Sequence, residues 1–553
     1  MFQATWSWMW EKHDQVKDLF RLFVKPSEVI EKNKTNSNTS SSKTNNSNNG
    51  DDSGNKRQYN KVQLIGLFLG PTAFILTLLF FSPEGLSSEG QAVLASTIWI
   101  AIWWMTEAIP IPATALLPVI LFPLTNGLDI GATTSAYGSD TIFLFMGGFV
   151  IALAMERWNL HRRIAVSIIS VIGTNTDRII LGFMVATGFL SMFISNTATA
   201  MMMVPIGLAI IYQVSDTLKE QKGMDITPEN FAFGKSLMLG IAYSASIGGM
   251  ATLIGTPPNV IFAGTINTMY GIEVSFASWM IFGVPFAWVF IFLTWFYLSK
   301  IAFKMEVTQI PGGAKIINEE KKKLGNASYE EKAVFVVFIL AAIAWISREF
   351  LLGPYVSENI NDAIIAITAA LVLFLIPAKN KKGDFLMNWE SAIKLPWGIL
   401  LLFGGGLAIA AGFTASGLSD WIGQQLAGLE NVAPIIIILS IAALVIFLTE
   451  ITSNTATATM MFPIMAALAV AVDVHPFILM IAAGLAASCA FMLPVATPPN
   501  AVVFGSGYLR IPDMAKAGFA LNILGIILVT LTVYFLVPMA LGIDINEIPA
   551  YIE

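Results

Sequence analysis

Long apolar stretches are the feature that most restricts how this chain can fold. Residues 62–81, 278–301 and 517–541 each approach or exceed the roughly 20 residues needed to cross the hydrocarbon core of a bilayer. Only 12% of the 553 residues are charged, against roughly 25% in an average soluble domain. A single signal peptide cannot account for so many stretches, so we expect an all-α polytopic membrane protein.

Composition divides the chain into five parts. Residues 1–32 interleave aromatic and charged side chains and predict an amphipathic cytoplasmic segment, with a loosely structured tail as the alternative. Residues 33–58, rich in Asn and Ser, predict a disordered linker. We expect a first membrane repeat over 59–300, a cytoplasmic loop over 301–331 and a second membrane repeat over 332–553.

Lysine and arginine collect beside some of the spans, which indicates the cytoplasmic faces. They occur before the first span, in the central loop and at 379–382, whereas 83–90, 353–362 and 542–553 contain acidic residues but no lysine or arginine. This alternation predicts a cytoplasmic N-terminus, an external C-terminus and an odd number of crossings, about eleven. The net charge of -6 argues against a nucleic-acid partner, and the one cysteine, Cys489, excludes an intrachain disulfide.

An internal repeat relates the two halves. Ser195-Asn196-Thr197 and its following residues match Ser453-Asn454-Thr455, and the Gly-rich elements around 147 and 405 share the same offset of 258 positions. Two Thr-Pro-Pro-Asn elements, beginning at Thr256 and Thr497, match at an offset of 241, and an insertion within 215–230 explains the difference. We therefore expect two structural repeats related by a pseudo-twofold axis, and expect them to be inverted.

Each repeated element suits the start of a helix inside apolar sequence. Ser, Thr and Asn cap free amides, and proline at the first helical position loses no needed hydrogen bond. Helix starts attract anions, and hydroxyl, amide and carbonyl oxygens suit sodium. Because 190–211 and 449–472 contain no lysine or arginine, an anion bound here needs other neutralisation, which favours cation coupling.

Other readings of these residues remain open. Gly147, Gly148 and the glycines at 404–406 could serve helix packing or the site. Glu107 and Glu450 are intramembrane acids with either a structural or a functional role. A nucleotide-binding glycine loop is missing, which argues against an ATP-driven pump, and the site has no nucleophile-base pair or metal cluster, which argues against an enzyme.

Over about residues 62–541 the sequence resembles the divalent anion/sodium symporters, which include carriers of succinate, malate, fumarate and citrate. The joint occurrence of two SNTATA segments and two Thr-Pro-Pro-Asn elements carries the resemblance. It implies a homodimer in the bacterial inner membrane, each protomer having a scaffold domain and a transport domain with two re-entrant hairpins tipped by Ser-Asn-Thr.

The resemblance also implies where the ligands bind. The substrate carboxylates are expected to contact Asn196, Thr197, Asn454, Thr455, Gly249 and Pro494. A first sodium site is expected at Ser191, Ser195, Asn196 and the backbone near Gly249. A second is expected at Thr449, Ser453, Asn454 and the backbone from Ala487 to Pro494.

The resulting hypothesis is sodium-coupled symport of a C4 dicarboxylate by alternating access. The family also contains sodium-independent exchangers with basic residues where sodium would bind, but Ser191 and Thr449 have no basic neighbour beside the motifs. An exchanger, a citrate or sulfate carrier and a passive anion channel are the alternatives.

Overall fold

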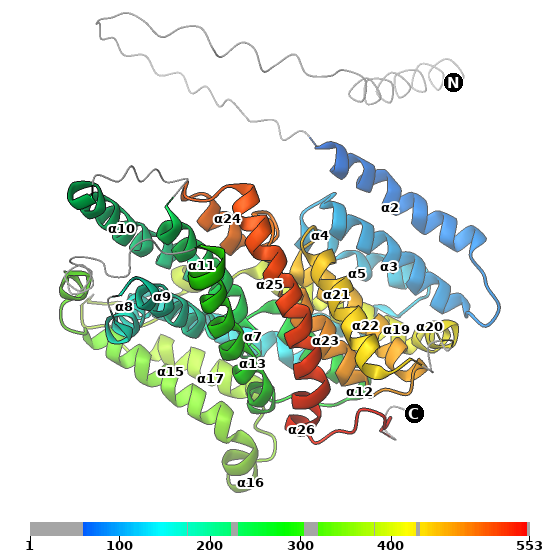
Figure 1. Ribbon diagram of the computed structural model, residues 1–553. Helices are drawn as coiled ribbons and strands as arrows, with labels where there is room; N and C mark the ends of the chain where they lie inside the picture. The colour runs from blue at the N-terminus through cyan, green and yellow to red at the C-terminus, as the bar shows by residue number, and fades with distance from the viewer. Residues whose placement is uncertain are drawn as a thin grey trace, which may run out of the picture. The chain divides into compact units, whose positions relative to one another are not determined.

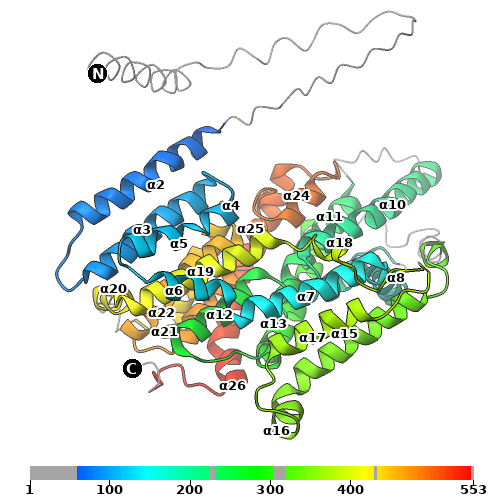
Figure 2. The same ribbon diagram turned by 180° about the vertical axis from the view of Figure 1, so that it is seen from behind.

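The computed structural model describes residues 59–549, apart from 174, 223–230, 304–318, 381, 427 and 429–431. The segments 1–32 and 33–58, for which we expected an amphipathic helix and a disordered linker, lie outside the described residues, as do residues 304–318 of the 301–331 loop. The predicted all-α fold is confirmed (Figures 1 and 2). An isolated β-bridge joins Pro377 to Phe385.

The helices fall into three consecutive groups. The first contains α2 (Lys61–Phe80), α3 (Ser88–Thr106), α4 (Ile111–Thr114), α5 (Leu117–Leu124), α6 (Ile130–Ser135), α7 (Asp140–Arg157) and α8 (Leu160–Ile172). The second contains α9 (Thr176–Ser191), α10 (Asn196–Lys222), α11 (Ala232–Gly249), α12 (Pro257–Tyr270) and α13 (Phe276–Phe296), which a π-helical turn extends over Tyr297–Ala302.

The third group holds the rest of the chain. It contains α15 (Tyr329–Ser347), a π-helical turn (Arg348–Leu352), α16 (Gly353–Tyr355), α17 (Asp362–Leu375), α18 (Trp389–Ala392), α19 (Trp397–Ala415), α20 (Leu418–Leu426), α21 (Pro434–Thr449), α22 (Asn454–Ala471), α23 (Pro476–Ala487), α24 (Pro498–Phe504), α25 (Ile511–Leu531), a second such turn (Thr532–Leu536) and α26 (Val537–Leu541).

Eight helical segments of the described chain are long and apolar enough to cross a membrane. They are Lys61–Phe80, Ile130–Arg157, Asn196–Asp216, Phe276–Ala302, Tyr329–Tyr355, Trp397–Ala415, Asn454–Ala471 and Ile511–Leu541. Shorter apolar helices such as Asp362–Leu375, Pro434–Thr449 and Pro476–Ala487 accompany them. The count of eleven crossings, which includes shorter and interrupted segments, stays a prediction.

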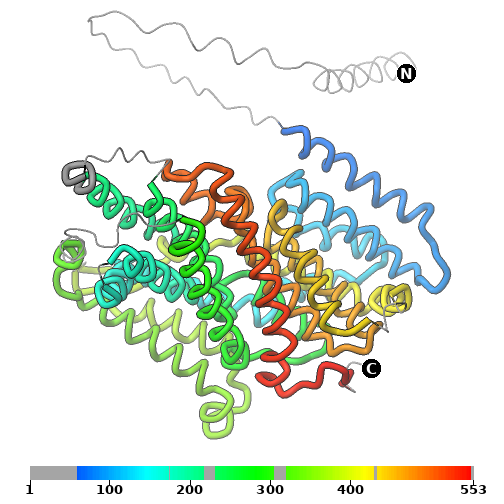
Figure 3. The backbone as a smooth tube through the Cα atoms, in the orientation of Figure 1, coloured from blue at the N-terminus to red at the C-terminus, as the bar shows by residue number. Residues whose placement is uncertain are grey.

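Close glycine contacts join α2 to α3. Gly66 and Gly70, four positions apart, are the buried residues of α2. A Cβ atom on Gly66 would overlap Thr106, and one on Gly70 would lie 2.6 Å from the Trp99 ring. Small residues at this spacing let two helix backbones approach closely in a membrane. The pair α2–α3 forms one side of the molecule (Figure 3).

The two halves interlock through their broken helices. From the first half, α12 packs on α22 and α23, and from the second half, α24 packs on α10 and α11. The Phe262 ring of α12 lies 6.0 Å from the Phe462 ring and 5.9 Å from the Phe477 ring, centre to centre. The motifs of both repeats are thereby brought into one central region.

The hairpins α9–α10 and α21–α22 open toward opposite ends of α25. After α10, Lys235 near the start of α11 pairs with Asp513 in the first turn of α25, with 2.9 Å between Nζ and Oδ2. After α22, the His475 amide donates to the Ile545 carbonyl beyond α26 at 2.8 Å. The helical segment Ile511–Leu541 between these points has 31 residues, roughly 46 Å at 1.5 Å per residue. Inverted repeats produce such an arrangement.

The Gly-rich elements serve packing. A Cβ atom on Gly147 would lie 2.6 Å from the Ala366 backbone of α17, and one on Gly405 would lie 2.5 Å from the Ala115 carbonyl oxygen. Neither glycine lines the cavity described below. Of the two readings left open for these glycines, the contacts favour close helix packing.

Candidate functional site

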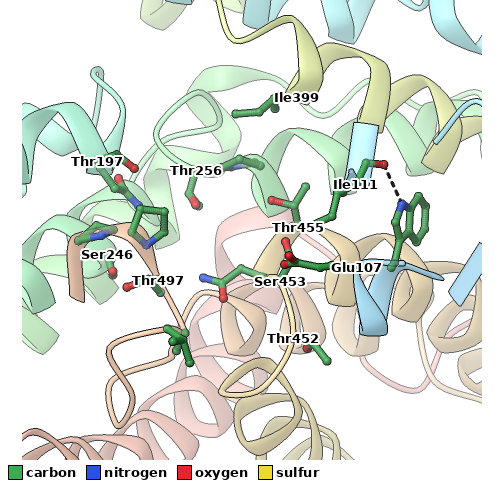
Figure 4. A pocket seen from close by; sticks show the side chains of 18 of the residues that line it. Glu107, Ile111, Thr197, Ser246, Thr256, Ile399, Thr452, Ser453, Thr455 and Thr497 are labelled. Carbon is green, nitrogen blue, oxygen red and sulfur yellow. Dashed lines mark hydrogen bonds between the residues drawn. The ribbon is translucent and has the colours of Figure 1, made fainter. Parts of the chain in front are cut away.

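A cavity of about 750 Å³ lies where the two repeats meet (Figure 4). Its wall includes both Ser-Asn-Thr motifs and both Thr-Pro-Pro elements, through residues 195–197, 255–257, 450–455 and 495–499. The opposite wall comes from the start of α2 and the end of α3, including Gln63 and Glu107. The repeated motifs, 258 and 241 positions apart, are therefore neighbours in space.

The charges on the cavity wall are all acidic. Among the lining residues there is no lysine, arginine or histidine, and Glu107 and Glu450 are the two ionisable groups. An anion in this cavity would therefore be neutralised by amides, hydroxyls and bound cations. The absence of basic residues beside the motifs, noted in the sequence, holds for the cavity wall as a whole.

Helices of more than one turn begin at the wall. Helices α10, α12, α22 and α24 start at Asn196, Pro257, Asn454 and Pro498. The side chain of Ser453 makes no capping bond to α22, and that of Thr256 makes none to α12. Their expected capping role is therefore wrong for these two residues, whereas Thr497 caps α24 by accepting from the Asn500 amide at 3.3 Å. Uncapped amides at a helix start carry a partial positive charge suited to an anion.

In the first half, three oxygen-bearing groups meet at the break between α9 and α10. The Ser191 hydroxyl donates to the Ala245 carbonyl at 2.6 Å and contacts the Asn196 side-chain amide. With its nitrogen turned to the carbonyls, the Asn196 amide donates to Ala245 at 3.0 Å and to Gly255 at 3.3 Å. Ser191 is fully buried.

The second half repeats this cluster. Thr449 Oγ1 lies 2.7 Å from Asn454 Oδ1 and 3.0 Å from the Ala487 carbonyl oxygen. Thr449 is fully buried, as Ser191 is. A hydroxyl, a side-chain amide oxygen and a backbone carbonyl are the hard oxygen ligands that sodium accepts. The donor chemistry therefore fits a sodium ion in the second half as it stands, and in the first half once the Asn196 amide oxygen is turned toward the cluster.

The asparagine of each Thr-Pro-Pro-Asn element ties down the unwound backbone that precedes it. Asn259 donates to the carbonyls of Gly249 at 3.2 Å and Thr252 at 2.8 Å. Asn500 donates to those of Ala490 at 3.1 Å and Leu493 at 3.0 Å. The two asparagines, and the two carbonyls that each one binds, are related by the same offset of 241 positions. These two residues were absent from the predicted site, although the repeated motif already contained them.

The unwound segment is longer in the second half. Helix α11 continues to Gly249, leaving 250–256 before α12, whereas α23 ends at Ala487, leaving 488–497 before α24. The sequence difference at Ser488-Cys489-Ala490 marks this earlier end. The second half also carries Glu450 where the first half has Met192.

Glu450 binds the extra unwound backbone. Its Oε1 accepts from the amides of Phe491 at 2.7 Å and Met492 at 2.9 Å and from Asn522 Nδ2 at 2.8 Å. Its Oε2 accepts from the Leu493 amide at 3.2 Å. The carboxylate thereby satisfies three backbone amides that have no helical partner in the unwound segment. Of the two readings, these bonds favour a structural role.

Most of the residues predicted as ligands line the cavity or lie just behind it, and two do not line it. Ser195, Asn196, Thr197, Ser453, Asn454 and Thr455 line the cavity, and Ser191, Thr449 and Ala487 lie just behind it. Gly249 and Pro494 do not line it. Gly249 lies in the last turn of α11, and a Cβ atom there would approach the Asn196 side-chain amide to 2.6 Å.

Residues of the Thr-Pro-Pro elements, which follow Gly249 and Pro494 in the chain, line the wall in their place. Gly255, Thr256, Ala496 and Thr497 line the cavity. The chain folds back after α11 and after α23. The starts of α12 and α24, and not the ends of α11 and α23, therefore reach the Ser-Asn-Thr tips. The offset of 241 was the signal that could have found them.

The comparison with known proteins agrees with this geometry. Residues 61–541 match the family described as the sodium:sulfate symporter transmembrane region. The chain belongs to this family. It is therefore a multi-pass membrane transport protein and not an enzyme.

Relatives within the family are similar over nearly the whole chain. The sodium-dependent dicarboxylate transporter SdcS of Staphylococcus saprophyticus is 54% identical over 494 residues, covering 89% of this chain and 94% of the relative. SdcS of Staphylococcus aureus strain USA300 is 53% identical over 497 residues, covering 90% and 95%. The structure of MtrF of Neisseria gonorrhoeae, titled as an antimetabolite efflux pump, has a TM-score of 0.52 at 13% identity over 85% of this chain and 95% of MtrF. That likeness concerns the fold alone.

Proposed function

We propose that this family member is a sodium-coupled symporter of C4 dicarboxylates such as succinate, malate and fumarate. The observation that carries the proposal is the pair of matched oxygen clusters, Ser191–Asn196 and Thr449–Asn454, behind one cavity whose wall has no basic side chain. The relatives named as sodium-dependent dicarboxylate transporters support the choice of both ions.

Sodium binds first in this mechanism. One ion is held by Ser191, Ser195 and Asn196 with nearby carbonyls, and a second by Thr449, Ser453 and Asn454 with nearby carbonyls. Each ion brings positive charge to a helix start that borders the cavity, which lowers the electrostatic cost of admitting a dianion. The dianion then binds between the two tips.

The substrate contacts differ from the first expectation at two positions. We propose that the carboxylates contact Asn196, Thr197, Asn454 and Thr455, together with the four Thr-Pro-Pro residues that line the cavity: Gly255, Thr256, Ala496 and Thr497. Gly249 and Pro494 act indirectly, through packing and backbone position.

The cavity opens on the side of the membrane where the first span begins, since Asn60 and Gln63 line it. We propose that this is the cytoplasmic side, because lysine and arginine flank that end of the span. On this assignment the site is accessible from the cytoplasm. Transport requires the hairpin-bearing part to move against a scaffold that includes α2 and α3, within a homodimer in the bacterial inner membrane.

Uptake of labelled succinate into proteoliposomes tests the proposal. We expect accumulation that requires an inward sodium gradient and is inhibited by malate and fumarate. Uptake that ignores the gradient and requires internal dicarboxylate would establish an exchanger instead. Sodium-dependent uptake of sulfate or citrate but not succinate would keep the coupling and replace the substrate.

A further inference from the structure

Two features of the end of α3, its backbone conformation and its helix dipole, disfavour a glutamate at position 107. It ends α3 in the left-handed conformation, with φ 48°, where glycine or asparagine is usual and other residues pay roughly 1–2 kcal/mol. Its carboxylate also stands at a helix C-terminus, where the helix dipole disfavours negative charge. Local structure alone gives no reason for a glutamate here, and such costs tend to collect at functional sites.

The surrounding fold holds the backbone and leaves the carboxylate free. Gln63 Nε2 donates to the Glu107 carbonyl at 3.2 Å, and the Ala108 amide donates to the Trp103 carbonyl at 3.3 Å. In the part of the chain that the structure describes, no hydrogen bond or ion pair reaches the Glu107 carboxylate. The side chain is exposed and extends into the cavity (Figure 4).

Among the described residues of the cavity wall, Glu107 is therefore the acid whose carboxylate has no hydrogen bond or ion pair. The other acid on the wall, Glu450, accepts four hydrogen bonds and is tied to the backbone. Ser453 and Thr455, at the second hairpin tip, share the cavity with Glu107. A dianion at the tips would meet one free negative charge, and that charge belongs to the scaffold.

We propose that Glu107 is a release residue, whose charge weakens dianion binding while the site faces the cytoplasm. This inference rests on the proposed symport and on the cytoplasmic assignment of the cavity. The repulsion acts on one face because Glu107 belongs to α3, whereas the hairpin tips move away from α3 when the site turns outward. Affinity for the dianion is then lower on the side where it must be discharged.

Glu107→Gln tests the proposal, because it removes the charge and preserves size. Half-saturation for the transported dianion is measured at saturating sodium in inverted vesicles, which present the cytoplasmic face, and in right-side-out vesicles. We expect binding at the cytoplasmic face to tighten about three- to tenfold, the effect of one charge in a partly solvated cavity, with the outer face unchanged. Glu107→Asp should behave as the wild type.

Glu89→Gln is the matched control. Glu89 is exposed in the first turn of the same helix and does not line the cavity, so its neutralisation should leave cytoplasmic-face affinity unchanged. Thermal unfolding in detergent establishes that each variant is folded.

Three results would overturn the proposal. Equal cytoplasmic affinity in wild type and Glu107→Gln would show that the charge does not act on the substrate. An equal gain in dianion affinity at both membrane faces would show that Glu107 does not act selectively on the cytoplasmic side. A raised sodium requirement in Glu107→Gln would make the carboxylate a cation ligand. If the wild type carries sulfate instead of succinate, the proposed substrate is wrong. The affinities of wild type and Glu107→Gln for sulfate at the two faces then still test the role of Glu107.

Discussion

Thr449 Oγ1 lies 2.7 Å from Asn454 Oδ1 across the break between α21 and α22, and the Ser191 hydroxyl contacts the Asn196 amide in the same way across the break between α9 and α10. Each hydroxyl also reaches a backbone carbonyl of the following helix. The two halves thus bring the same three groups, a hydroxyl, an asparagine amide and a backbone carbonyl, together beside one cavity.

Removing the Thr449 hydroxyl should weaken sodium binding. In Thr449→Val the shape is kept while one oxygen ligand is lost, and we expect the sodium concentration for half-maximal uptake to rise about tenfold, which corresponds to about 1.4 kcal/mol. Sodium-induced thermal stabilisation without substrate gives an independent measure. Thr449→Ser keeps the hydroxyl and should stay within about twofold of the wild type. An unchanged sodium response in Thr449→Val would remove this residue from the site.

Asn196→Ala and Asn454→Ala should each abolish dicarboxylate uptake. Each loses a side-chain amide that borders both the sodium cluster and the cavity. The variants should still be recovered folded, with the same oligomeric state as the wild type, by size-exclusion chromatography with light scattering. Asn359→Ala, at an exposed loop position, is the control and should transport normally. Normal uptake by either tip variant would refute the site.

Gly249→Ala should disrupt the first sodium site by steric overlap. The new methyl group would lie 2.6 Å from the Asn196 side-chain amide and 3.0 Å from the Gly255 carbonyl oxygen, so the Asn196 side chain must shift. We expect loss of most sodium-dependent uptake. Gly138→Ala provides the comparison, because nothing lies within 4 Å of its added Cβ atom. If Gly249→Ala transports as well as Gly138→Ala, the close contact between Gly249 and Asn196 is not needed for transport.

Glu450→Gln should destabilise the second half. The carboxylate accepts from three backbone amides and Asn522, and a side-chain NH₂ group would replace one acceptor oxygen. Leaving such buried donors unpaired costs about 2–4 kcal/mol, which should appear as a lower unfolding temperature in detergent. Glu390→Gln, at an exposed position, should unfold as the wild type. Unchanged stability with lost transport would instead assign Glu450 to the transport step.

The amino-acid sequence by itself determined the membrane class, the all-α fold and the pairing of the motifs. Apolar length reports membrane insertion directly, because each span must satisfy its own backbone in lipid. The fixed offset of 258 positions likewise identified Ser191 with Thr449 and Asn196 with Asn454, since duplicated segments fold alike.

The tertiary structure decided which residues reach the cavity and which support it. Gly249 and Pro494 lie off the wall, and Thr256 and Thr497 lie on it, because the position where a helix unwinds and restarts determines which backbone faces the tips. Glu450 meets Asn522, 72 positions away, and Glu107 enters the cavity from a helix outside the repeated motifs. Such contacts depend on how the two halves interlock, and no local pattern of residues encodes that.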